Sequence, residues 1–165
     1  MLAVVMLAVA AAGGLVVAGR SAVDETVADI NHAVHIARDL ECVDCHTGVE
    51  THAVAGVPAI AICAECHDDP EDAIGKSRNG KLVLSHIAAK EELWWPQLYW
   101  LPDQVVFSHR RHVALGEIPC ERCHGDIAAT TTLPERPVRA TLTMDGCLEC
   151  HERSGADLDC FACHK

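Results

Sequence analysis

All ten cysteines of the 165-residue sequence lie in one pattern, Cys-x-x-Cys-His, which occurs five times. Two thiols at this spacing can bond to one flat group, and the histidine after the second thiol can reach a metal at the centre of that group. The pattern is the attachment signature of haem c, in which the thiols add to two vinyl groups and the histidine is the proximal ligand of the iron. We therefore predict five covalently bound haem c groups. Their attachment residues are Cys42, Cys45, Cys63, Cys66, Cys120, Cys123, Cys147, Cys150, Cys160 and Cys163, and the proximal ligands are His46, His67, His124, His151 and His164.

Zinc is the alternative occupant of such a motif, because a single Cys-x-x-Cys-His could be half of a zinc knuckle. A zinc site needs four ligands around one ion and does not require a histidine directly after the second cysteine. Five copies that use every cysteine leave no thiol over for a disulfide or a zinc pair. The repeated pattern therefore favours haem.

Six further histidines are candidates for the second axial position of the irons. Bis-histidine ligation lowers the reduction potential relative to His/Met ligation and leaves no open position on the iron. Six candidates for five irons are enough to close every iron, so we predict an electron-transfer protein rather than an enzyme, with no catalytic residues. The candidates are His32, His35, His52, His86, His109 and His112.

Four of these histidines form two His-x-x-His pairs, at 32–35 before the first motif and at 109–112 before the third. Side chains at i and i+3 of a helix leave it on nearly the same face, so each pair can ligate two neighbouring irons. A surface helix with incidental histidines is the alternative. His52, between the first and second motifs, is assigned to the second haem, whereas His86 is either a ligand or a residue without that role. Met144, just before the fourth motif, is a possible axial ligand, although a packing role is the favoured interpretation.

The composition leaves little material for an ordinary core, since the chain has only three Trp, two Phe and one Tyr. We expect the porphyrins to supply the interior. The predicted fold is mainly α, with few, short helices and much coil, organised around stacked haems as in multihaem cytochromes c. Most of the aromatic residues fall at positions 94–100, where they either cover a haem or form a patch for a partner or the membrane.

The motif positions predict a dihaem lobe at 30–67, a linking segment at 68–106 and a trihaem lobe at 107–165. Residues 1–19 carry no charge, and Arg20 follows. Nineteen helical residues span about 28 Å, close to the hydrocarbon thickness of a bilayer. We predict that residues 1–20 form one N-terminal transmembrane helix that anchors the protein, with a cleaved signal peptide as the alternative. With either an anchor or a cleaved signal peptide, we expect the rest of the chain to be exported from the cytoplasm.

The formal net charge is −11, from 24 acidic and 13 basic residues. Nucleic acid selects for clusters of Lys and Arg, so it is excluded as a partner. The acidic surface suits either a basic partner or simple solvation.

The arrangement of the third motif resembles that of class III multihaem cytochromes c. In that class, Phe-x-His-x-x-His before a motif supplies the distal ligand of that motif's haem and of a neighbour, and residues 107–112 match this element. The resemblance implies that His109 ligates the iron of His124 and that His112 ligates another iron.

A wider similarity is to the pentahaem cytochrome c subunit of alternative complex III and to related multihaem subunits of quinone reductase complexes. It rests on Thr-Gly-Val after the first motif, Ala-Gly-Val-Pro at 55–58, Leu-Pro-Asp at 101–103 and Leu-Thr-Met at 142–144. It implies an anchored subunit with its haem domain on the periplasmic face of the cell membrane. Such a subunit exchanges electrons with iron–sulfur and quinone-interacting membrane subunits, and with a cytochrome c or oxidase. A soluble periplasmic or extracellular electron shuttle is the alternative.

The haem-free chain is expected not to fold, because the cofactors replace the missing core. Circular dichroism and denaturant titration of the haem-free protein should show no cooperative transition. A compact haem-free form that unfolds cooperatively would contradict this expectation.

Overall fold

The computed structural model describes residues 29–69, 71, 73–139 and 142–165. The predicted transmembrane helix at 1–20 lies outside the described residues. Among the residues described, no helix combines the length and apolar character that a membrane crossing requires.

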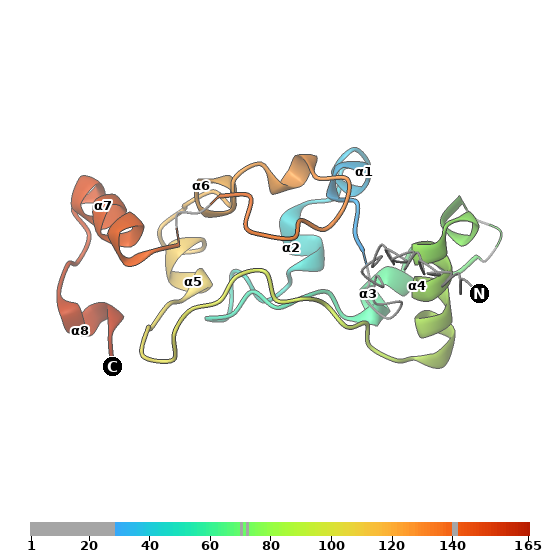
Figure 1. Cartoon of the computed structure of the whole chain (residues 1–165), viewed down its shortest axis with the longest axis horizontal. Helices are drawn as coiled ribbons and strands as arrows, with labels where there is room; N and C mark the ends of the chain where they lie inside the picture. The colour runs from blue at the N-terminus through green and yellow to red at the C-terminus, as the bar shows by residue number, and fades with distance from the viewer. Residues whose placement is uncertain (1–28, 70, 72, 140–141) are drawn as a thin grey trace, which may run out of the picture.

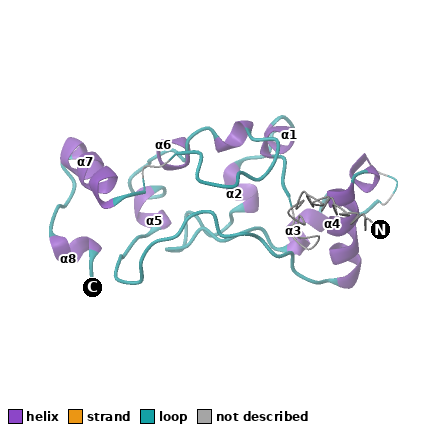
Figure 2. Ribbon diagram, viewed as in Figure 1, coloured by secondary structure: helices purple, strands orange, loops and turns teal. Residues whose placement is uncertain are grey.

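The described chain forms an elongated molecule of short helices joined by long loops, with α3 and α4 at one end and α7 and α8 at the other (Figures 1 and 2). An isolated β-bridge joins Val105 and His164. The prediction of a mainly helical chain with short helices and much coil is confirmed. The helices are α1 (His32–Ile36), α2 (Cys42–Cys45), α3 (Ile60–Ala64), α4 (Arg78–Ala89), α5 (His109–His112), α6 (Glu121–His124), α7 (Met144–Ser154) and α8 (Cys160–Cys163), with 3-10 turns η1 (Ala73–Lys76) and η2 (Ile127–Ala129).

Polar side chains cap α1, α5, α7 and α8, which carry histidines or cysteines. Asn31 accepts from the backbone of Val34 at the start of α1, and Ser108 does the same for α5. Thr143 caps α7 and Asp159 caps α8. A helix of four or five residues is far below the length that is stable alone in water, so contacts outside the helix must hold these segments.

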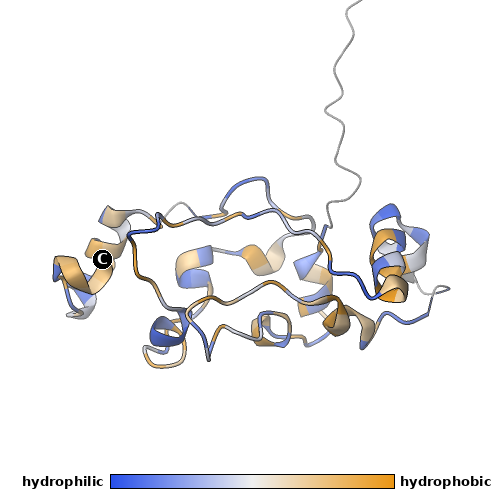
Figure 3. Cartoon of the chain, turned by 90° about the horizontal axis from the view of Figure 1, so that it is seen from below, coloured by the Kyte–Doolittle hydropathy of each residue, from blue (hydrophilic) through white to orange (hydrophobic). Residues whose placement is uncertain are grey.

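The hydrophobic core of the described chain is small. Four apolar side chains are buried, namely Val49, Ile60, Val83 and Leu93, and no described side chain is completely enclosed. Apolar residues are instead spread along the whole molecule (Figure 3). The protein part by itself therefore supplies far less burial than a domain of this length normally needs.

The packed part of the core joins α4 to α3, at the second motif. Ile60 on α3, Val83 on α4 and Leu93 form one cluster, against which Cys63 and Trp95 also pack. Gly80 allows α4 to pass η1, because a Cβ at this position would lie 1.7 Å from the carbonyl oxygen of Ile74. Much of the predicted linking segment thus packs on the second motif.

The segments predicted as two lobes are joined by direct hydrogen bonds. The backbone N–H of Ala33 donates to the carbonyl of Thr130 at 3.1 Å, and that of His109 donates to Ala53 at 2.9 Å. Asp29 also accepts from the backbone of Leu133. Residues 29–67 and 107–139 are therefore joined by hydrogen bonds along the described chain.

Replacing Leu93 with alanine should lower the free energy of unfolding of the holoprotein by about 2–4 kcal/mol, because it leaves a cavity between α3 and α4. Denaturant titration measures the change. Leu115→Ala is the matched control, since Leu115 is 64% exposed and its loss should change stability by no more than about 0.5 kcal/mol. Equal effects of the two variants would show that this cluster does not stabilise the fold.

Candidate haem-binding sites

Each Cys-x-x-Cys-His motif forms a turn of helix that brings its two thiols to one side. In four motifs the backbone N–H of the histidine donates to the carbonyl of the first cysteine, with distances of 2.9–3.0 Å for His46, His67, His124 and His164. His151 lies within the longer helix α7. All ten cysteines are at least partly exposed. The motifs thus present paired thiols and an adjacent imidazole that an incoming group can reach.

The proximal histidines include two whose ring is held by a main-chain carbonyl. The Nδ1 of His46 lies 2.8 Å from the carbonyl oxygen of Gly56, and that of His151 lies 2.7 Å from Asp157. A carbonyl oxygen only accepts, so Nδ1 must carry the proton. The lone pair is then on Nε2, which is the form of histidine that binds a metal.

The same bond occurs at three of the histidines predicted as distal ligands. The Nδ1 of His35 donates to Asn31 at 2.8 Å, that of His112 to Ser108 at 2.9 Å, and that of His109 to Ala53 at 3.0 Å. These rings are therefore fixed in orientation and have Nε2 available.

A side chain fixes the ring of His32 instead. The hydroxyl of Thr130 donates its proton to the carbonyl of Ile127 at 2.7 Å, so it can only accept from the Nδ1 of His32, 3.0 Å away. The lone pair of His32 is again on Nε2. Sequence reasoning missed Thr130, which lies 98 positions from His32 and belongs to no motif.

Three pairs of imidazoles have nearly the same separation between their ring centroids. The ring centroids are 6.2 Å apart for His35 and His67, 6.3 Å for His109 and His124, and 6.1 Å for His112 and His151. Two imidazoles bonded to opposite faces of one metal through nitrogen–metal bonds of about 2 Å place their centroids about 6.2 Å apart. Each pair therefore has the spacing of two axial ligands.

His32 and His46 are also neighbours. Burial lowers the pKa of His32, and the imidazole of His46 lowers that pKa further. Burial likewise lowers the pKa of His124, with His109 as the next cause. Both effects favour the neutral imidazole, which is the ligating form.

The three remaining candidates for axial ligands lie outside these imidazole pairs. The sequence assigns His52 to the second haem, but its Nδ1 lies 2.7 Å from the hydroxyl of Thr51. The ring paired with His67 is that of His35. His86 lies on α4, its Nδ1 3.3 Å from the carbonyl of Glu91. Met144 is exposed at the start of α7.

The aromatic segment at 94–100 divides between exposed and partly buried positions. Trp94 and Trp100 are exposed, whereas Tyr99 meets the ring of His124 edge-on, with centroids 4.6 Å apart. Trp95 packs against the same cluster as Cys63. Its buried indole Nε1 has no hydrogen-bond partner among the described residues.

Five of the cysteines have surroundings that favour the neutral, protonated thiol. Burial raises the pKa of Cys45, Cys63, Cys120, Cys123 and Cys147, and neighbouring cysteines raise it further in each case. Thiols of different motifs therefore lie near one another.

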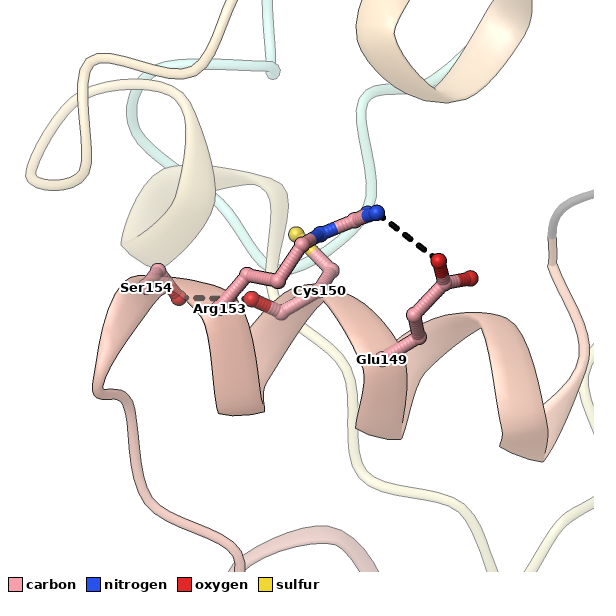
Figure 4. Close-up of polar contacts among 4 residues, drawn as sticks. All are labelled: Glu149, Cys150, Arg153 and Ser154. Carbon is pink, nitrogen blue, oxygen red and sulfur yellow. Dashed lines mark hydrogen bonds and ion pairs between the residues drawn. The ribbon is translucent and has the colours of Figure 1, made fainter.

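On α7 the fourth motif sits beside a surface ion pair (Figure 4). Arg153 and Glu149 are 2.8 Å apart, and the Cys150 thiol projects from the same side of the helix. Ser154 donates to the carbonyl of Cys150 at 2.8 Å. Because both charged groups are exposed, the ion pair adds little stability. A cavity of about 340 Å³ lies between this part of α7 and residues 117–122.

These residues fit haem c. The donor set consists of paired thiols and of imidazoles whose Nε2 is available, and this is the chemistry of a covalently attached, axially ligated porphyrin. The unpartnered indole N–H of Trp95 lacks an acceptor beside Cys63, and haem carries carboxylates. Apolar side chains left exposed within the motifs, such as Leu148 and Phe161, suit contact with a flat apolar group.

Fold and sites together define a multihaem c-type cytochrome. Residues 105–165 match the protein family described as cytochrome c7 and related cytochrome c. The chain is also 30% identical over 163 residues to the menaquinone reductase, multihaem cytochrome c subunit, of Nitratidesulfovibrio vulgaris, an alignment that covers 82% of this chain and 74% of the relative. The chain therefore belongs to the multihaem cytochromes c, and membership implies covalently bound haem c.

Replacing Thr130 with valine should weaken the bond between His32 and its iron roughly 10- to 100-fold, because the Nδ1–H loses its acceptor and the ring its orientation. Carbon monoxide, which binds only where a distal ligand leaves, measures the effect on the reduced holoprotein. Thr131→Val, at the exposed neighbouring position, is the control. Indistinguishable carbon monoxide binding by the two variants would rule out His32 as a ligand supported by Thr130.

Proposed function

We propose that this chain is a membrane-anchored pentahaem c-type cytochrome that moves electrons along a row of haems as a subunit of a quinone-linked respiratory complex. The observation that carries the electron-transfer role is the set of three imidazole pairs at 6.1–6.3 Å. An iron held between two imidazoles has no open position, so it exchanges electrons without binding a substrate. This closed coordination also argues against an enzymatic role for the chain itself.

Each motif is proposed to hold one haem through its two thiols and proximal histidine. The facing rings assign His35 to the iron of His67, His109 to that of His124, and His112 to that of His151. His32 is assigned to the iron of His46, because His46 is near enough to lower the pKa of His32 beyond the effect of burial. The iron of His164 takes its second ligand from the remaining candidates, His52, His86 and Met144.

The haems supply the redox chemistry, and the protein sets their position and potential. Nδ1–H bonds to carbonyls increase the electron density on Nε2 and favour the oxidised iron, which keeps the potentials low. Tyr99, edge-on to His124, packs against one proximal ring and limits its rotation.

The link to a quinone-linked complex rests on the relative, which is named as a subunit of a menaquinone reductase. By that similarity the partners would be the iron–sulfur and quinone-interacting membrane subunits of such a complex, or a cytochrome c or oxidase acceptor. The related alternative complex III contains a subunit of the same kind. Residues 1–20 would hold the chain to the membrane, with the haem domain on the periplasmic face.

Mass spectrometry of the intact protein purified from membranes tests the proposal in one measurement. We expect a mass that includes five haems and residues 1–20, together with co-purifying quinone-interacting subunits. A monomeric, soluble protein without its N-terminal segment would favour the alternative, a periplasmic or extracellular shuttle. Zinc at the thiols, or no haem, would refute the proposal altogether.

A further inference from the structure

The motifs do not follow one another in space as they do in the sequence. We propose that the haems are arranged in the order second, first, third, fourth, fifth, so that the row ends at the motifs 63–67 and 160–164. This order rests on the proposed function, because it presupposes one haem at each motif. Electrons would then enter and leave through the second and fifth haems, and the first haem, although nearest the N-terminus, would be internal.

Helix α1 links the second and first sites. It carries both His32 and His35, which lie three positions apart on one short helix. The ring of His35 faces His67 at 6.2 Å, and His32 is a neighbour of His46. One turn of helix separates the two distal ligands, so the irons that they bind must be adjacent.

Helix α5 links the third and fourth sites in the same way. His109 faces His124 and His112 faces His151, at 6.3 and 6.1 Å. The thiols of Cys123 and Cys150 are also near enough to interact. The third and fourth haems are therefore adjacent.

The first site lies directly against the third. Helix α2 of the first motif and helix α6 of the third are neighbours in the middle of the molecule (Figure 1), and after burial the Cys42 thiol is the next cause that raises the pKa of Cys120. A thiol becomes the link to the edge of its own haem, so these neighbouring motifs bring the edges of the first and third haems together. The hydrogen bond from Ala33 to Thr130 joins α1 to the turn after α6 at the same place.

The two remaining sites lie at opposite ends of the molecule. The helix of the second motif, α3, packs on α4 at one end (Figure 1). The fifth motif forms α8, beside α7 at the other end (Figure 1), and after burial the Cys163 thiol is the next cause that raises the pKa of Cys147. Phe161, inside the fifth motif, is 86% exposed. The fifth site is therefore open to a partner, whereas the first site lies between its two neighbours.

Two double variants give opposite results for the two possible orders. Cys42→Ala with Cys45→Ala removes the first haem, and Cys63→Ala with Cys66→Ala removes the second. In the proposed order, the first variant cuts the second haem off from the other three, so that after flash reduction one of the four remaining haems equilibrates in a separate slow phase. The second variant keeps four connected haems and shows no such phase. The reverse result would mean that the haems follow the sequence order.

The iron positions in the wild-type holoprotein decide the question if either variant fails to mature. Anomalous X-ray scattering at the iron edge should place the iron of His67 at one end, with a single iron neighbour, the iron of His46. Finding the iron of His67 between those of His46 and His124 would overturn the order. The outcome is independent of the partner complex, whose absence would instead appear in the mass spectrum of the membrane preparation.

Discussion

The hydrogen bond from a histidine Nδ1 to a main-chain carbonyl is the interaction on which the arrangement of the sites depends. It recurs at His35, His46, His109, His112 and His151, with distances of 2.7–3.0 Å. A bond of this kind settles the tautomer, the direction of the ring and the basicity of the nitrogen that faces the metal. It also connects distant parts of the chain, because the acceptor for His109 lies 56 positions away. The path of the loops is therefore constrained, because each must place a carbonyl oxygen beside the Nδ1 of a ligand histidine.

The small size of the hydrophobic core also follows from the dependence of the structure on its haem sites. Four buried apolar residues cannot offset the conformational entropy lost by more than a hundred ordered residues. Helices of four residues cannot persist alone either. Attached porphyrins would provide the missing apolar area and would tie each short helix to the rest by two covalent bonds. The single well-packed cluster, where Leu93 and Val83 meet Ile60, stabilises one end of the molecule only.

The sequence predicts the local structure of each attachment site, but not the contacts between residues that are distant in the chain. The spacing of Cys42, Cys45 and His46 predicts an attachment site because all its requirements lie within five residues. Helix caps such as Ser108 are readable for the same reason. The pairing of His35 with His67, and the support that Thr130 gives to His32, depend on the path of intervening loops, which no local pattern encodes. The position of His52 in the sequence predicts a ligand for the second haem, whereas the ring whose centroid lies 6.2 Å from that of His67 belongs to His35.

Helices α1 and α5 each carry two axial-ligand candidates within a single turn. A turn of helix moves as a rigid body, so a displacement of the helix that lifts one imidazole from its iron also lifts the other. Detachment at neighbouring centres would then be concerted, and heat or denaturant would open pairs of irons together. Such mechanical coupling keeps adjacent centres in the same ligation state, which holds their reduction potentials in a constant relation.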